Sequence, residues 1–370
     1  MKLLIVFGTR PELIKLAPII AVASTYPTVI THVCFTGQHP DMVRPLAAAL
    51  DVPIHTQLEL LDTHGDLSCL SAQLIQQLKP VMIEEEPDFC MVQGDTTSAL
   101  CGALSAFYHR IPVVHVEAGL RSGNMHEPFP EEMNRRLMTQ LASIHFAPTE
   151  HDAQNLRASG IVAHVVTVGN TVVDAVLNSQ ANLPKACSGF PVLVPDKRTV
   201  LVTCHRRENW GDSLHALCDA LKKLVDTQPI QIVFVCHANP ALQAKIHACL
   251  DGCASIHIVP PMVYPTFIRL MQVSDIIITD SGGIQEEAPV LGKPVLVFRN
   301  TTERIQGIQS GQARCVSADT LVQIVTEVFH NSNLYQEMSK QKSLYGDGKA
   351  SQRVIDYLLD NYTETRLTVS

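Results

Sequence analysis

Two carboxylates follow short apolar segments at matched positions. Asp95 comes just after the segment Phe89–Gln93, and Glu117 comes directly after the segment Val113–Val116. The residues between them, Thr97–Tyr108, read as a helix, so the stretch predicts a βαβ unit with parallel strands. Neighbouring strands lie about 4.8 Å apart, and we expect both side chains at the carboxyl edge, where α/β sheets bind ligands. Carboxylates within reach of one ligand suit general acid–base chemistry.

A third acidic pair, Glu131 and Glu132, follows on a segment that can return over this edge. The alternative for a strand-end acid is purely structural, because such a residue can cap the next helix. Asp95 could do so next to Thr97, and we expect that role in addition to a chemical one.

The chain begins with an apolar segment, Lys2–Phe7, followed by GTRPE. Pro11 suits the first turn of a helix, and a strand, glycine and helix in this order direct backbone N–H groups toward an anion. Arg10 and Lys15 add positive charge there, although a solvated Arg10 is the plain alternative. The segment lacks GxGxxG and is no Walker loop, so neither a nicotinamide nor an ATP site is indicated.

A second group of candidate residues follows the predicted strand Asp275–Thr279. Ser281, Gly282 and Gly283 form a glycine turn at the start of a helix, which predicts another anion site. Glu286 and Glu287 follow; they either complement the helix dipole or accept hydrogen bonds from ribose hydroxyls. Cations expected at the same sheet edge are His205, Arg206, Arg207 and Arg304. Carboxylates in one half and a diphosphate grip in the other favour a nucleotide sugar as ligand.

Composition restricts the class of protein. The 370 residues suit two domains, and 46% hydrophobic with 17% charged residues supply packed cores. A net charge of −8 argues against nucleic acid as a partner, and no apolar run approaches a membrane span. The 11 cysteines form no CxxC pair, and His237, Cys249 and Cys253 fit no standard metal site. We expect a reduced cytoplasmic protein with no metal or cofactor and no membrane partner.

Strand-like and helix-like segments alternate along the whole chain, which indicates an α/β fold with two doubly wound parallel sheets. A segment with three prolines, 180–198, interrupts the alternation. We expect Rossmann-like domains at residues 1–169 and 170–350, facing each other across a cleft. The final helix, within 351–370, is expected to pack back on the first domain.

Several segments resemble the bacterial non-hydrolysing UDP-N-acetylglucosamine 2-epimerases. They are FGTRPE, QGDTTSAL, HVEAGLRSG, PFPEEMNR, GNTVVDA, HRRENWG and TDSGGIQEEAPVLGKPVL, and the resemblance runs from residue 1 to about residue 350. It implies the glycosyltransferase-B architecture and interconversion of UDP-GlcNAc and UDP-ManNAc. The family's route eliminates UDP to form 2-acetamidoglucal and then adds it back, supplying ManNAc units for surface polysaccharide. It also implies a homodimer.

The resemblance assigns roles to particular positions. The catalytic positions of the family fall on Asp95, Glu117, Glu131 and His205. Ligand-contacting positions fall on Arg10, Lys15, Ser281, Gly282, Gly283, Glu287 and Arg304, and Phe267 matches a position near the uracil. Gln38 and His39 match a region that in several members holds a second UDP-GlcNAc as activator.

The sequence departs from the family pattern in places. TGQHPDM replaces the more usual TGQHREM, so Pro40 and Asp41 alter the region of the activator. Arg304 is followed by Ile305 instead of the usual proline–glutamate continuation, and Pro261–Val263 replaces polar residues before Phe267.

Other activities share the expected scaffold. A hydrolysing epimerase would release free ManNAc and UDP, but its N-terminal motif typically differs from FGTRPE. A glycosyltransferase would not need three acids around the sugar. A catalytically silent nucleotide-sugar sensor would have no reason to retain Asp95, Glu117, Glu131 and His205 together.

Overall fold

The computed structural model describes residues 1–61, 65–182, 190–206, 209–302, 304–340 and 344–362. The chain divides into two compact units. The first comprises Met1–Ala175 and Tyr345–Ser370, and the second comprises Val176–Leu344. Within the described ranges, no helix combines the length and apolar character needed to cross a bilayer.

The first unit is built on a seven-stranded sheet whose paired strands are all parallel. Its strands are apolar because helices cover both faces of the sheet. In spatial order the strands are β3 (Thr56–Gln57), β2 (Ile30–Phe35), β1 (Lys2–Phe7), β4 (Phe89–Gln93), β5 (Val113–Val116), β6 (Ile144–Ala147) and β7 (Val165–Thr167). The short β3 was not predicted, because two residues carry no periodic signal.

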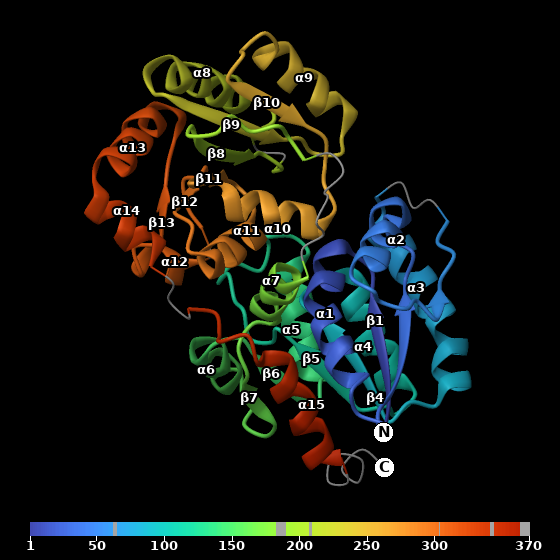
Figure 1. Cartoon of the computed structure of the whole chain (residues 1–370). Helices are drawn as coiled ribbons and strands as arrows, with labels where there is room; N and C mark the ends of the chain where they lie inside the picture. Colours follow the sequence, from blue (N-terminus) through green and yellow to red (C-terminus); the bar gives the residue numbers. More distant parts are fainter. Residues whose placement is uncertain (62–64, 183–189, 207–208, 303, 341–343, 363–370) are drawn as a thin grey trace. The chain divides into compact units, whose positions relative to one another are not determined.

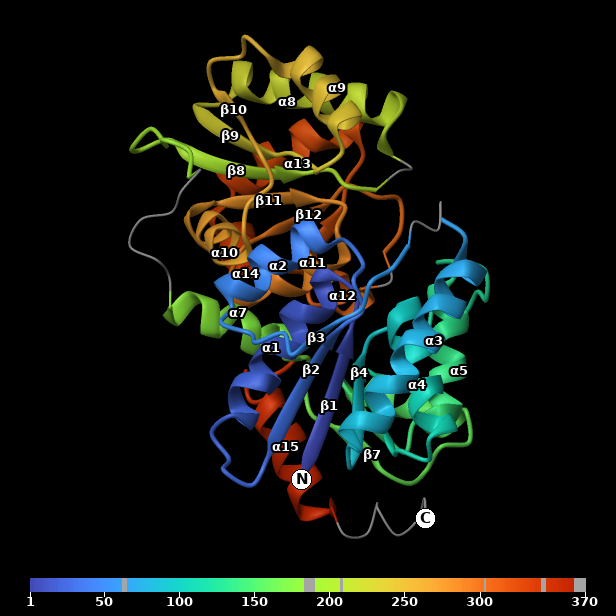
Figure 2. The same ribbon diagram turned by 90° about the vertical axis from the view of Figure 1, so that its right-hand side faces the viewer.

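Helices connect successive strands of this sheet. Figure 2 shows α3, α4 and α5 beside one another on one side of β1 and β4, with α1 and α15 on the other side. The helices are α1 (Arg10–Ala23), α2 (Pro40–Ala49), α3 (Leu67–Glu85), α4 (Thr97–Tyr108), α5 (Glu131–Leu141), α6 (Glu150–Ala158), α7 (Thr171–Ala181) and α15 (Ala350–Asp360).

The register of β4 and β5 decides where the first two carboxylates lie. These strands are parallel neighbours, and Gln93 pairs with Val116 at their carboxyl ends. Asp95 and Glu117 therefore both leave the sheet at the same edge, as the sequence predicts. The order of the strands reverses direction between β1 and β4, which makes this edge the ligand-binding position of a doubly wound sheet.

The second unit contains a six-stranded parallel sheet. Its order also reverses direction in the middle, here between β8 and β11. In spatial order the strands are β10 (Ile256–Val259), β9 (Ile230–Val235), β8 (Arg198–Thr203), β11 (Ile276–Thr279), β12 (Val295–Val297) and β13 (Ala313–Cys315). The three-residue β13 was not predicted. Two Rossmann-like units of this kind confirm the expected fold class.

Helices cover both faces of the second sheet as well (Figure 1). One face packs against side chains of α8, α9, α13 and α14. The helices are α8 (Asp212–Thr227), α9 (Pro240–Leu250), α10 (Tyr264–Val273), α11 (Gly282–Glu287), α12 (Ile305–Gln309), α13 (Ala318–His330) and α14 (Ser332–Ser339). A 3₁₀ turn, Ala288–Leu291, continues α11.

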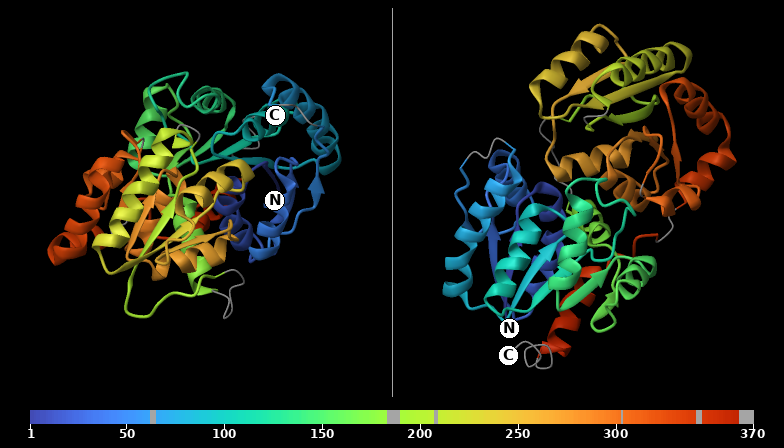
Figure 3. Two further views of the ribbon diagram at one scale, coloured as in Figure 1. Left: turned by 90° about the horizontal axis from the view of Figure 1, so that it is seen from above. Right: turned by 180° about the vertical axis from the view of Figure 1, so that it is seen from behind.

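The C-terminal helix α15 lies against the first unit (Figures 1 and 3). The Asp174 carboxylate accepts hydrogen bonds from the first amides of α15, Ala350 N at 3.3 Å and Ser351 N at 2.8 Å. Tyr26 of α1 donates to Asp356 at 2.7 Å. The division between the units falls within α7, between Ala175 and Val176, and the sequence-based boundary was placed six residues earlier, after residue 169.

Two buried histidines lie side by side on β5 and β6, where His115 pairs in register with His145. Burial lowers the pKa of His115 to about 4 and that of His145 to about 3. An unfolded histidine titrates near pH 6.5, so below that pH the unfolded chain binds protons that the native rings do not. The free energy of unfolding is therefore expected to fall as the pH drops from about 6.5 toward 4, by up to about 3 kcal/mol per ring.

Replacing one ring isolates this effect. His145→Leu should make the loss of stability between pH 7.5 and 4.5 clearly smaller, measured as the free energy of unfolding in urea. His247→Gln is the matched control, because His247 lies on α9 with half of its side chain exposed (50%). Equal pH dependence in both variants would contradict the assignment.

Candidate active site

Glu117 is held by two side chains at the carboxyl edge of the first sheet. Lys15 Nζ lies 2.5 Å from Glu117 Oε2, and Gln93 Nε2 donates to the same oxygen at 2.6 Å. Lys15 and Glu117 are both only 9% exposed in their side chains. Glu117 also has a positive φ of 65°, which turns its side chain sharply after β5. The sequence predicted Lys15 as a cation beside an anion, whereas the structure makes it the counter-ion of Glu117.

Asp95 is paired with an arginine of α5. Arg135 Nη2 lies 2.6 Å from Asp95 Oδ2 and Arg135 Nε donates to the same atom at 2.9 Å. Asn134 donates to the Asp95 carbonyl oxygen at 2.8 Å. The N-cap of α4 is Thr96, whose hydroxyl accepts from Ala99 N at 3.0 Å. The predicted helix-cap role of Asp95 is therefore wrong, because a long-range ion pair takes its carboxylate.

Glu131 is the first residue of α5, one turn before Asn134 and Arg135. Residues at this spacing share a helix face, so Glu131 lies on the side of α5 that contacts Asp95. Its Oε2 atom is buried and has no hydrogen-bond partner among the described residues. The structure thus brings Glu131 to the edge that holds Asp95, and one of its oxygens is available to a ligand or a proton.

Glu132 was expected only as part of an acidic patch, but it is completely buried. Burial would raise its pKa, yet the Ser122 amide at 2.9 Å and the guanidinium groups of Arg136 and Arg135 hold that pKa below its usual range. Arg135 therefore joins two carboxylates, those of Asp95 and Glu132. This fixes the first turns of α5 against the strand end.

Glu12 connects the loops that follow β1 and β4. Its carboxylate accepts from Gly8 N at 3.1 Å, from Thr9 N at 2.7 Å and from Thr96 Oγ1 at 2.8 Å. Burial raises the pKa of Glu12 to about 7, although these hydrogen bonds oppose the rise. Arg10, the first residue of α1, is exposed beside this loop.

Gln38 lies at the same edge, and His39 follows it. Ser98 donates to Gln38 Oε1 at 2.8 Å, and a Cβ on Gly8 would lie only 2.6 Å from that oxygen. The close approach explains why a residue without a side chain stands at Gly8. His39 is exposed and begins α2 in a left-handed conformation with φ 52°.

In the second unit, His205 and Arg206 follow β8 and contact Asp280, which follows β11. The completely buried Asp280 carboxylate accepts from His205 N at 2.9 Å and from Arg206 N at 2.9 Å. Asn209 Nδ2 donates to it at 2.8 Å. Arg207, also predicted as a cation here, lies outside the described residues.

The His205 ring is packed among aromatic groups. It meets the His237 ring edge-on, with 5.4 Å between centroids, and Trp210 lies 5.7 Å from His237. Trp210 Nε1 donates to the His205 carbonyl oxygen at 3.2 Å. The ring of the predicted catalytic histidine is therefore confined on one side by other rings.

The Arg304 side chain lies against the Ser281–Gly283 turn. The Arg304 guanidinium is so close to Gly282 that an added Cβ would lie 3.0 Å from its Cζ atom. Arg304 Nε donates to Glu286 at 3.1 Å, and both Glu286 and Glu287 are buried. Because α11 has only six residues, Glu287 is its last residue and does not lie at the start of a long helix. The structure thus places Ser281, Gly282, Gly283 and Arg304 together.

Phe267 lies on α10 and is half-buried. It stays a site residue predicted by the resemblance alone.

Sequence reasoning missed three polar residues of these two edges, Gln93, Arg135 and Asp280, and gave Glu132 no role beyond its acidic pair. Each stands within a motif already noticed, but each was passed over as strand, helix or turn. Their common feature is burial, at most 9% exposed, in an element that carries a candidate site residue. A charged residue inside an otherwise apolar strand–turn–helix junction is the signal that could have identified Asp280.

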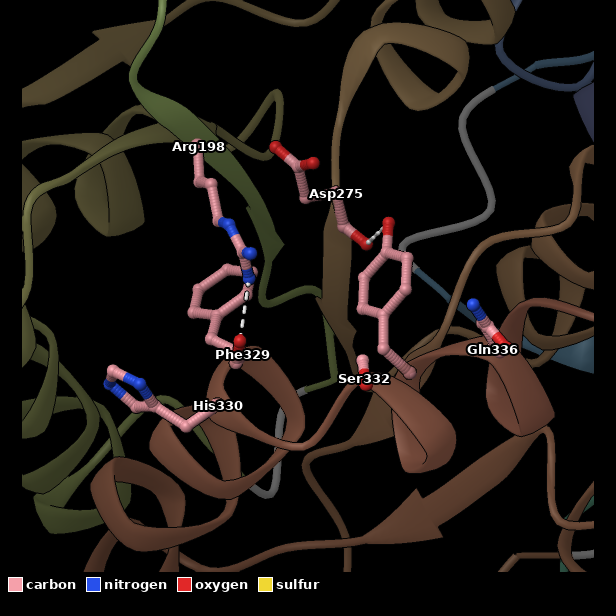
Figure 4. A pocket seen from close by; sticks show the side chains of 7 residues that line it. Arg198, Asp275, Phe329, His330, Ser332 and Gln336 are labelled. Atoms are coloured by element: carbon pink, nitrogen blue, oxygen red, sulfur yellow. Dashed lines mark hydrogen bonds between the residues drawn. The ribbon is translucent and has the colours of Figure 1, made fainter.

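A pocket on the second unit lies away from the sheet edge that carries His205 and Asp280. Arg198, Asp275 and Tyr335 line it at the amino ends of β8 and β11, where Arg198 also stacks over the Phe329 ring (Figure 4). Two hydrogen bonds join its lining residues: Arg198 Nη1 donates to the Phe329 carbonyl oxygen at 3.0 Å, and Tyr335 Oη donates to the Asp275 carbonyl oxygen at 3.3 Å. In the part of the chain that the structure describes, no cluster of three His, Cys, Asp or Glu side chains could hold a metal ion.

The chain is similar to known proteins in both sequence and structure. The family model described as UDP-N-acetylglucosamine 2-epimerase matches residues 23–359. The UDP-N-acetylglucosamine 2-epimerase of Escherichia coli K12 is 40% identical over 372 residues, covering 98% of this chain and 99% of that protein. The crystal structure of the Neisseria meningitidis UDP-GlcNAc 2-epimerase bound to UDP-GlcNAc superposes with a TM-score of 0.91 at 37% identity, covering 98% and 100% of the two chains. The Methanocaldococcus jannaschii enzyme in complex with UDP-GlcNAc and UDP gives a TM-score of 0.84 at 32% identity, covering 97% and 100%.

The Lys15–Glu117 pair yields a prediction about stability. Lys15→Met leaves a nearly buried carboxylate without its counter-ion, which should lower the free energy of unfolding by about 3–5 kcal/mol. The double variant Lys15→Met/Glu117→Gln should recover part of that loss, measured by urea denaturation at pH 7.

Arg157→Met is the matched control, because Arg157 pairs with Glu150 at 2.6 Å on the surface, where the side chains are 44% and 59% exposed. This variant should lower the free energy of unfolding by less than about 1 kcal/mol. If Lys15→Met were no more destabilising than Arg157→Met, the buried pair would contribute no more to stability than a surface pair.

Proposed function

The chain belongs to the UDP-N-acetylglucosamine 2-epimerase family, and from that premise we propose that it interconverts UDP-GlcNAc and UDP-ManNAc without hydrolysing either. The observation that carries the proposal is the gathering of Asp95, Glu117 and Glu131 at one sheet edge, with Lys15 and Arg135 as counter-ions. Epimerisation at C2 needs proton transfer on two faces of the sugar, and three carboxylates provide groups for both.

The two units hold different parts of the substrate in this proposal. The sugar lies against the carboxylates of the first unit. The diphosphate is bound by cations of the second unit, His205, Arg206 and Arg304, next to the Ser281–Gly283 turn. Glu287 accepts hydrogen bonds from the ribose hydroxyls, and Phe267 packs near the uracil. Arg10 adds a charge at the diphosphate, while Lys15 acts through Glu117.

The reaction proceeds by elimination. The bond from C1 to the diphosphate oxygen breaks, and UDP leaves with the bonding electron pair while cations stabilise its charge. A carboxylate removes the C2 proton, and the electrons of that C–H bond form the C1–C2 double bond of 2-acetamidoglucal. A second acid then protonates C2 on the opposite face while the UDP oxygen adds to C1. The base that took the C2 proton and the acid that gave one regain their starting states by proton exchange with water, so atoms and charge balance over the cycle, and neither a metal nor a nicotinamide takes part.

The ion pairs of the first unit suit these steps. Lys15 and Gln93 donate to one oxygen of Glu117, and Arg135 donates to one oxygen of Asp95. These contacts hold both carboxylates at the sheet edge, and in the proposal the two groups act as bases or stabilise an oxocarbenium-like sugar. Glu131, whose Oε2 atom is buried without a protein partner among the described residues, suits the carrier of the proton. We assign the three acids jointly to the two faces.

The proposal extends to the setting of the enzyme. The product supplies ManNAc units for surface polysaccharide in the cytoplasm. A second UDP-GlcNAc binds as activator near Gln38 and His39. A homodimer uses exposed apolar side chains at the ends of α3 and α4, namely Ile83, Phe107 and Tyr108, which are 53%, 55% and 63% exposed.

Isotope exchange tests the reaction and separates it from its alternatives. Incubation with UDP-GlcNAc in D₂O should give UDP-ManNAc and recovered UDP-GlcNAc that both carry deuterium at C2, as measured by NMR and mass spectrometry. Free ManNAc with UDP would point to a hydrolysing epimerase, and transfer of the sugar would point to a glycosyltransferase. An absence of exchange despite binding would indicate a sensor.

Removal of a carboxylate tests the assignment of the acids. Asp95→Asn and Glu117→Gln should each lower turnover by roughly 10²–10⁴-fold, because each deletes a positioned acid–base group. Glu150→Gln is the control, since Glu150 begins α6 after the neighbouring strand β6 but is exposed. Near-normal turnover in either of the first two variants would remove that residue from the mechanism.

The glycine turn gives a second test, directed at the diphosphate. Gly282→Ala would push the Arg304 guanidinium away, and loss of one charge-assisted contact should weaken UDP binding about tenfold or more in calorimetry. Gly211→Ala is the control, because Gly211 precedes α8 and a Cβ there would meet nothing within 4 Å. Equal affinities of the two variants would argue against a role of Arg304 in binding UDP.

A further inference from the structure

Asp280 is a buried charge that the proposed reaction does not use directly. It follows β11 at the point where the strand order of the second sheet reverses, and its exposed fraction is 0%. A carboxylate removed from water costs free energy unless hydrogen-bond donors surround it. The identity of those donors therefore indicates what the charge is for.

Three residues of the loop after β8 donate to this carboxylate. His205 N reaches both oxygens, at 2.9 and 3.0 Å, and Arg206 N reaches Oδ2 at 2.9 Å. Asn209 adds a side-chain donor at 2.8 Å. In return, Arg206 Nε donates to the Asp280 carbonyl oxygen at 3.1 Å. The residue that follows β11 thus holds the backbone of the loop that carries the proposed catalytic histidine.

The alternative is that Asp280 only stabilises the sheet. Asp275, at the opposite end of β11, allows a comparison. Asp275 also bridges to β8, since its carboxylate accepts from Thr199 N at 2.7 Å. That contact joins two strands where no proposed site residue lies. Asp280 differs because the loop it holds carries His205, whose ring meets the His237 ring and whose carbonyl oxygen accepts from Trp210 Nε1.

The interactions of Asp280 also restrict how an anion can bind. The amides of His205 and Arg206 both donate to the carboxylate, so they are occupied within the protein. A diphosphate at this edge must therefore be met by side chains of the β8 loop and not by these two backbone groups. The direction of the His205 side chain then matters directly.

We propose that Asp280 is a positioning residue for His205: its buried carboxylate, accepting from His205 N, Arg206 N and Asn209 Nδ2, fixes the imidazole for the departing diphosphate. The proposal rests on the proposed epimerase function and deepens it. An asparagine cannot replace the aspartate, because its Nδ2 group is a donor and would face donors. A displacement of a catalytic group by about 1 Å can cost about 10²-fold in rate.

A double-mutant cycle tests the proposal on the full-length protein with UDP-GlcNAc. Asp280→Asn should lower kcat about 10²-fold with a much smaller change in KM. In the His205→Ala background the same change should have little further effect on kcat, because there is no ring left to position. Additive losses of kcat would overturn the proposal. Asn209→Ala removes only one of the donors, so it should lower kcat by a smaller factor. That loss of kcat should also disappear in the His205→Ala background. This variant decides the question if Asp280→Asn does not fold.

Asp275→Asn is the control, since it breaks the matching contact at the opposite end of the strand. It is expected to lower the melting temperature and to leave kcat unchanged. If it lowered kcat as Asp280→Asn does, simple bracing of the sheet would suffice as an explanation.

A spectroscopic readout keeps the proposal separate from the function on which it rests. The His205 ring signals, assigned by their loss in His205→Ala, should shift in Asp280→Asn or Asn209→Ala and stay in place in Asp275→Asn. Unmoved signals would overturn the positioning role even in an active enzyme. If the wild-type protein showed no epimerase activity but the ring signals still shifted in these variants, the positioning role of Asp280 would stand. The proposed epimerase function would then be wrong.

Discussion

The structure depends on one constraint, the burial of charge at the carboxyl edges of two parallel sheets. Such an edge collects the residues that follow the strands, and a carboxylate placed there must be neutralised or surrounded by donors. Glu117 meets this need through Lys15, and Asp95 through Arg135. Asp280 meets it through amides, and Glu286 through Arg304.

This constraint explains why the two units resemble each other in plan but differ in chemistry. Both have a strand order that reverses in the middle, and both carry their candidate residues at that position. In the first unit the carboxylates accept from long cationic side chains, which keeps negative charge at the edge. In the second unit the buried carboxylates hold a histidine loop and an arginine in place. The first arrangement suits proton transfer and the second suits an anion.

The buried networks also connect elements that lie far apart in the sequence. Lys15 on α1 reaches Glu117 after β5, and Glu12 on the same helix joins the loops after β1 and β4. A change in any one element is therefore felt at the others, because a buried network with one missing member leaves unsatisfied charge. The polar residues of the motifs are as much a part of the fold as the apolar strands.

The sequence alone determined the strands other than the short β3 and β13, the parallel sheets, the sheet edge that carries Asp95 and Glu117, and the family. Apolar runs followed by acids and glycines signal these features locally. Only the tertiary structure decided the partners: Lys15 and Glu117 are 102 residues apart, and Asp280 and His205 are 75 apart. Pairing at such separations depends on strand order and side-chain direction, which no local pattern encodes. For the same reason the helix-cap rule failed for Asp95, whose carboxylate pairs with Arg135 instead.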